Sequence, residues 1–79
     1  MKKVLLTRRT DETPWERFEK VFCYRVRKDG TFMVASKWNG TVEGYIAKNA
    51  VKFLMNEPAA QWIDVPQGRN LFRVTLYEA

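Results

Sequence analysis

The feature that most constrains this chain is the alternation of apolar and polar residues on both sides of Asp29-Gly30. Apolar side chains stand at every second position before this pair and again after it. They are Phe22, Tyr24, Val26, Phe32 and Val34. Such alternation predicts strands with one buried face, and an Asp-Gly between two of them is typical of a hairpin turn. Residues 18–38 are therefore predicted to form one long β-hairpin.

The length of the turn decides which side chains of the hairpin face the core. A two-residue turn at Asp29-Gly30 would mix arginines with apolar residues on both faces. A three-residue turn that begins at Lys28 separates them, with the apolar side chains on one face and cations on the other. These cations are Arg25, Arg27 and Lys37. Because a shift of one residue exchanges the faces, we expect the three-residue turn, with Gly30 left-handed at a bulge.

A helix is predicted after the hairpin. Thr41 is a good N-cap, and proline at position 58 disfavours helical conformation at the residue before it. Apolar residues recur between these points at helical spacing, which predicts that they face the core. They are Val42, Ile46, Ala50, Phe53 and Leu54. Asn56 is expected to close the helix in the left-handed conformation.

Three further strands complete the prediction. A short one is expected around residues 4–7, ending at Arg8-Arg9, and two more over residues 61–65 and 70–77. The last two flank a type I turn at Pro66-Gln67-Gly68. In the final strand, Phe72, Val74 and Leu76 are expected to face the core.

The expected order β-β-β-α-β-β describes a single α+β domain over residues 1–79. Its preferred architecture is an open, antiparallel five-stranded sheet with the helix packed on its apolar face. The alternative is a five-stranded barrel of OB-fold order, with the helix between the third and fourth strands. The open sheet is favoured because the first strand is short for a barrel.

The amino-acid composition gives little support for a catalytic function. The chain has no histidine and one cysteine, Cys23, which excludes histidine-based nucleophile systems and the common zinc sites. The four scattered glycines do not form a phosphate-binding loop. The acidic residues Asp11, Glu12, Glu16 and Glu19 are interpreted as a charge-balanced connector, in which residues 13–16 form a helical turn and Trp15 packs at the core edge. We expect a protein that is not an enzyme and has no metal, cofactor or small-molecule substrate.

The cellular location is predicted from features that the sequence lacks. One cysteine precludes an internal disulfide, and no apolar run approaches the length of a membrane span. The apolar run near the start of the chain is too short for a signal peptide. We expect a cytoplasmic protein without a membrane partner.

The positive charge is unevenly distributed. The net charge is +5, and residues 1–37 hold ten Lys and Arg against five acids, whereas residues 38–79 hold four of each. This asymmetry predicts an anionic partner, either nucleic acid or a nucleoprotein or acidic protein surface. Cations would contact phosphates and aromatic rings would stack on bases. The candidate contact residues are Arg8, Arg9, Arg25, Arg27, Lys28, Lys37, Trp38 and Tyr77.

An alternative of a different class is a phage or mobile-element inhibitor, similar in size and in its lack of motifs to anti-CRISPR proteins. Such a protein would act by protein–protein contact with a host defence complex. A third possibility is a subunit whose edge strand pairs with another chain. Whether the protein acts as a monomer or a homodimer is left open.

Overall fold

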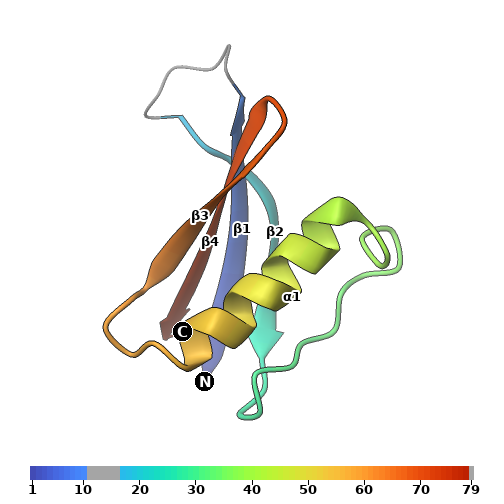
Figure 1. Cartoon of the computed structure of the whole chain (residues 1–79). Helices are drawn as coiled ribbons and strands as arrows, with labels where there is room; N and C mark the ends of the chain where they lie inside the picture. The colour runs from blue at the N-terminus through green and yellow to red at the C-terminus, as the bar shows by residue number, and fades with distance from the viewer. Residues whose placement is uncertain (11–16, 79) are drawn as a thin grey trace.

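The computed structural model describes residues 1–10 and 17–78, which form a four-stranded sheet with one helix across it (Figure 1). The elements are β1 (Lys2–Thr10), β2 (Glu19–Val26), α1 (Val42–Met55), β3 (Trp62–Gln67) and β4 (Asn70–Glu78). The strand order is β2-β1-β4-β3, and every neighbouring pair is antiparallel. Strand β1 is therefore central, and β2 and β3 form the two edges.

The predicted five-stranded sheet is wrong, and so is the barrel alternative. The described residues form four strands in the order β-β-α-β-β, and the sheet is not closed. The strand that is missing is the second half of the predicted hairpin, because residues 31–41 form no ladder with β2.

The turn itself has the predicted form. The Gly30 N–H donates to the Arg27 carbonyl (2.9 Å), and the Arg27 N–H donates to the Thr31 carbonyl (2.8 Å). Three residues therefore lie between the paired ends, and Gly30 has a φ of 86°. The Asp29 carboxylate accepts bonds from the Thr31 hydroxyl (2.6 Å) and the Thr31 N–H (3.0 Å), and these bonds lower the pKa of Asp29.

Beyond the turn, the chain leaves β2 and forms other hydrogen bonds in place of a ladder. The Ala35 N–H donates to the Tyr24 hydroxyl (3.2 Å), and the Trp38 N–H donates to the Ala35 carbonyl (2.8 Å). Phe32 is buried in the core, as its alternation predicts. The alternation thus predicted the burial of Phe32 and the partial burial of Val34, although Ser36 is exposed and this segment is not a strand.

The core lies between the helix and one face of the sheet. Its side chains come from all strands except β3, from the helix and from Phe32. They are Val4, Leu6, Phe22, Val26, Phe32, Ala47, Ala50, Val51, Leu54, Phe72, Val74 and Leu76. The prediction that Phe22 and Val26 face inward is confirmed, as is the inward alternation of the last strand.

Strand β1 is longer than predicted. It continues past Arg8 to Thr10, and Arg8, Arg9 and Thr10 all pair with residues of β4. Because ladder hydrogen bonds use the backbone, a strand between two neighbours can continue where the apolar pattern stops.

The helix begins as predicted, but it presents a different face to the sheet. The Gly44 N–H donates to the Thr41 hydroxyl oxygen (3.1 Å), which makes Thr41 the N-cap. The buried positions are Gly44, Ala47, Ala50, Val51 and Leu54. Phe53, predicted to be a core residue, is 49% exposed, and Val42 is also exposed. Asn56 ends the helix in the right-handed conformation (φ −97°), so the predicted left-handed cap is wrong.

The second hairpin turns later than predicted. Gln67 pairs with Asn70, so the turn consists of Gly68 and Arg69 alone. Gly68 has a φ of 60°, as the first central residue of the two-residue hairpin turns requires. Pro66 lies within β3, which is an edge strand, where a residue without an N–H is tolerated.

Residues 11–16 and 79 lie outside the described part of the chain. The predicted helical turn over residues 13–16, the packing of Trp15 and the roles of Asp11, Glu12 and Glu16 fall there. Among the described residues, no helix is long and apolar enough to cross a membrane.

Candidate nucleic-acid interface

The sheet face opposite the helix, named the open face below, gathers side chains from all four strands. Residues directly opposite each other in a ladder point to the same side, so the registers define rows across the sheet. Two rows matter most. The first contains Arg25, Lys3 and Tyr77, and the second contains Cys23, Leu5, Thr75 and Trp62. No helix of the described residues covers this face (Figure 1).

The first row places two cations side by side. Lys3 on β1 lies opposite Arg25 on β2 and, on its other side, opposite Tyr77 on β4. Neither cation forms an ion pair with the described residues. Like charges directly opposite each other destabilise a sheet, so this pair has an energetic cost that a bound anion would remove.

Tyr77 lies along the open face rather than standing away from it. Its hydroxyl is 3.3 Å from the Cys23 sulfur, and β1 lies between the strands that carry these two residues. The side chain therefore reaches across β1 and exposes its ring, which leaves the residue 39% exposed. The hydrogen bond with Cys23, followed by partial desolvation, raises the pKa of Tyr77, so its hydroxyl is neutral at physiological pH.

A second ring, that of Trp62, is held on the same face by Arg73. The Arg73 guanidinium lies 4.2 Å from the centre of the Trp62 ring and 4.7 Å from that of Phe18. It also donates two hydrogen bonds to the Asp64 carboxylate, at 2.8 and 3.0 Å, and these raise the pKa of Arg73. The charge of Arg73 is thus matched by Asp64, and its role is to hold Trp62, which remains 50% exposed.

The eight candidate contact residues do not form one surface. Arg25, Tyr77 and, at the far end of β1, Arg9 occupy open-face positions. Arg8 points to the other side, and its guanidinium is 4.0 Å from the Glu19 carboxylate. The remaining four lie elsewhere. Arg27 and Lys28 belong to the turn after β2, and Lys37 and Trp38 belong to the segment that leads to the helix.

Trp38 packs at the edge of the core. Its ring centre is 5.7 Å from that of Phe22, and the Lys37 ammonium lies 5.1 Å from the centre of the Trp38 ring. Half-buried in this way, Trp38 has a structural role in addition to the contact role predicted for it.

Lys3 and Trp62 also lie on the open face, although neither is among the contact residues predicted from the sequence. Lys3 alternates with Val4 in the same way that Arg25 alternates with Val26, which was a usable signal. Trp62 gave a weaker signal, because its strand has no clear alternation.

The described residues contain no cluster of side chains suited to a metal ion. Comparisons of this chain with protein-family models, with curated proteins and with solved structures find no match.

Proposed function

We propose that this protein is a non-enzymatic binding protein that holds single-stranded nucleic acid on the open face. The observation that supports this most strongly is the row Arg25, Lys3 and Tyr77. In it, two adjacent cations that form no ion pair within the described part of the chain lie beside a ring that runs along the sheet. Cations that contact phosphates beside rings that stack on bases are the usual means of binding single strands. A cytoplasmic location is part of this proposal.

Single strands fit this face better than duplexes do. The exposed rings of Tyr77 and Trp62 are of use only to bases that are not already stacked within a helix. Among residues 1–10 and 17–78, no helix or ribbon that could enter a major groove projects from the open face. We therefore expect binding with little sequence preference, strengthened by low salt.

The test is fluorescence anisotropy with an unstructured 12-nucleotide DNA or RNA at two salt concentrations. Lys3→Glu should weaken binding about tenfold or more, because it replaces a phosphate contact with a repulsive charge. Its unfolding free energy should stay equal or rise by up to ~1 kcal/mol, because Glu at position 3 faces Arg25. The change thus separates binding from folding.

Lys48→Glu is the matched control. It makes the same change in net charge at an exposed position on the helix, away from the open face. It should weaken binding no more than about twofold, through long-range charge alone. Equal losses in the two variants, or no binding by the unmodified protein at low salt, would contradict the proposal.

A second candidate function is protein–protein inhibition, and one observation favours it. The outer side of the helix carries three exposed apolar side chains, Val42, Tyr45 and Phe53. Tyrosine is enriched at the energetic centres of interfaces. A partner bound there would be lost with Tyr45→Ala and Phe53→Ala but retained by Lys3→Glu, which distinguishes this function from nucleic-acid binding.

A further inference from the structure

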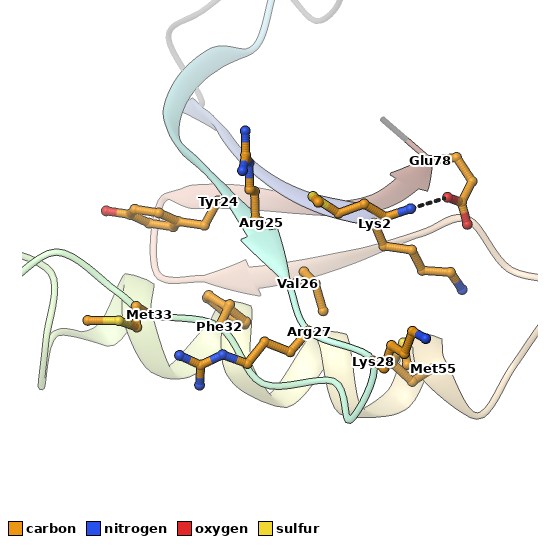
Figure 2. A pocket seen from close by; sticks show the side chains of 11 residues that line it. Lys2, Tyr24, Arg25, Val26, Arg27, Lys28, Phe32, Met33, Met55 and Glu78 are labelled. Carbon is orange, nitrogen blue, oxygen red and sulfur yellow. Dashed lines mark hydrogen bonds and ion pairs between the residues drawn. The ribbon is translucent and has the colours of Figure 1, made fainter.

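We infer that a cleft beside the turn after β2 binds a small amphipathic anion, an alkyl chain that ends in a carboxylate or phosphate. The cleft lies on the helix side of the sheet, at the end of β2, and has a volume of about 900 Å³. Its floor is apolar and its rim is cationic (Figure 2). Most of this site is separate from the proposed nucleic-acid interface, which uses the opposite face, although Arg25 also lines the cleft.

The cleft exists because the predicted hairpin does not continue. After the turn, the chain moves away from β2, and the C-terminal end of the helix approaches from the other side (Figure 1). Gly30 lies against Met55, since a Cβ built on Gly30 would be 3.4 Å from the Met55 side chain. The space between the end of β2, the turn and the helix is thus left without a side chain to fill it.

The floor of the cleft is apolar. It is lined by Val26 from β2, Phe32 and Met33 from the segment after the turn, and Met55 from the helix. Met33 is 74% exposed, so its side chain is accessible to a ligand in the cleft. Methionine side chains are flexible and adapt to ligands of irregular shape, which suits an alkyl chain.

The rim is cationic. Lys2 from β1 and Arg27 and Lys28 from the turn line the cleft and are exposed, and Figure 2 labels their side chains. The only acidic residue among the described lining residues is Glu78, whose carboxylate is 3.3 Å from the ammonium of Met1. The charge at the opening therefore favours an anionic head group over a neutral or cationic one.

The size of the cleft and the nature of its walls determine the ligand class. Pockets of roughly 300–1,000 Å³ suit small molecules. The floor offers few hydrogen-bonding groups, which disfavours a nucleobase or a sugar and favours a hydrocarbon chain. Lysine and arginine at the rim would pair with the carboxylate or phosphate.

The experiment is isothermal titration calorimetry with four ten-carbon probes at concentrations below micelle formation. Decanoate and decyl phosphate should bind, decan-1-ol should bind about tenfold more weakly, and decyltrimethylammonium should not bind. The expected difference follows from two or three partly exposed ion pairs, each worth a few-fold in affinity. Equal binding of decanol or of the cationic probe would overturn the assignment, as would binding to phosphatidylglycerol vesicles alone.

Two charge-matched double variants locate the site. Arg27→Glu with Lys28→Glu should weaken decanoate binding about tenfold, whereas Lys48→Glu with Lys52→Glu should leave it within about twofold. All four side chains are exposed, so neither variant removes core packing. Met33→Ser, which shortens the apolar floor, should weaken decanoate and decanol alike. Unchanged decanoate affinity in the Arg27→Glu, Lys28→Glu protein would overturn the inference. Lys3→Glu should change the affinity for decanoate no more than about twofold, through long-range charge.

Discussion

Gly44 illustrates how one residue positions the helix. A Cβ built on Gly44 would lie 2.5 Å from the carbonyl oxygen of Trp38. That oxygen accepts bonds from the Thr41 hydroxyl (2.6 Å) and the Thr41 N–H (3.2 Å), so it cannot move away without weakening the N-cap. The absence of a side chain at position 44 therefore permits the close approach between the helix and residue 38.

Gly44→Ala should consequently destabilise the protein. Alanine usually stabilises a helix relative to glycine by about 1 kcal/mol. Here the clash with the Trp38 carbonyl should outweigh that gain, with a net loss of about 1–3 kcal/mol, as for other overpacked sites. Urea unfolding measures the difference.

The matched control for this change is Asn49→Ala, at an exposed position of the same helix. It should be neutral or slightly stabilising, because only helix propensity changes. A gain in stability for Gly44→Ala similar to that of Asn49→Ala would show that the close approach at Trp38 is not a constraint.

At the scale of the elements, the helix is rotated by about one residue, or ~100°, from its predicted orientation. The prediction followed the largest apolar side chains, including Val42 and Phe53. The structure instead buries Gly44, Ala47 and Val51, together with Ala50 and Leu54, which the prediction also placed in the core.

Alanine substitutions at two neighbouring residues of the helix test this rotation. Leu54→Ala should cost about 2–5 kcal/mol, because Leu54 is buried in the core. Phe53→Ala should cost less than about 1 kcal/mol, although it removes a larger side chain, because half of that side chain is exposed. Thermal or urea unfolding of the pair measures both values. A larger loss for Phe53→Ala than for Leu54→Ala would restore the orientation predicted from the sequence.

The predicted hairpin shows what local patterns can and cannot establish. The strand with Phe22 and Val26, the three-residue turn and the conformation of Gly30 were all predictable, because each depends on neighbouring residues. The second strand was not, because alternation reports which side chains are buried and not which backbone they pair with. In the structure, the Ala35 N–H donates to the Tyr24 hydroxyl and not to the backbone of β2. No local feature of the sequence excluded pairing with that backbone.

At the scale of the whole molecule, the open face could be predicted only in part. The outward positions of Arg25 and Tyr77 follow from alternation within their own strands. Their relation to Lys3 requires the strand order β2-β1-β4-β3, which places β1 between partners from both ends of the chain. That order depends on pairing between residues far apart in the sequence. The outward position of Arg25 could therefore be predicted, but its place in a row with Lys3 and Tyr77 could not.

The same architecture separates the two proposed surfaces. The helix and the core occupy one side of the sheet, and the amphipathic cleft lies at the edge of that side. The open face, with its cations and rings, is the surface that we propose binds single-stranded nucleic acid. Variants of Lys3 and of Arg27 should therefore affect different ligands.

The most direct test of the central claim is an amide chemical-shift map of the labelled protein titrated with a short single-stranded oligonucleotide. If single strands bind to the open face, the largest shifts should occur at Lys3, Arg25, Tyr77 and the neighbouring Trp62, and they should diminish as salt is added. Shifts concentrated on the outer side of the helix, around Tyr45 and Phe53, would contradict this claim.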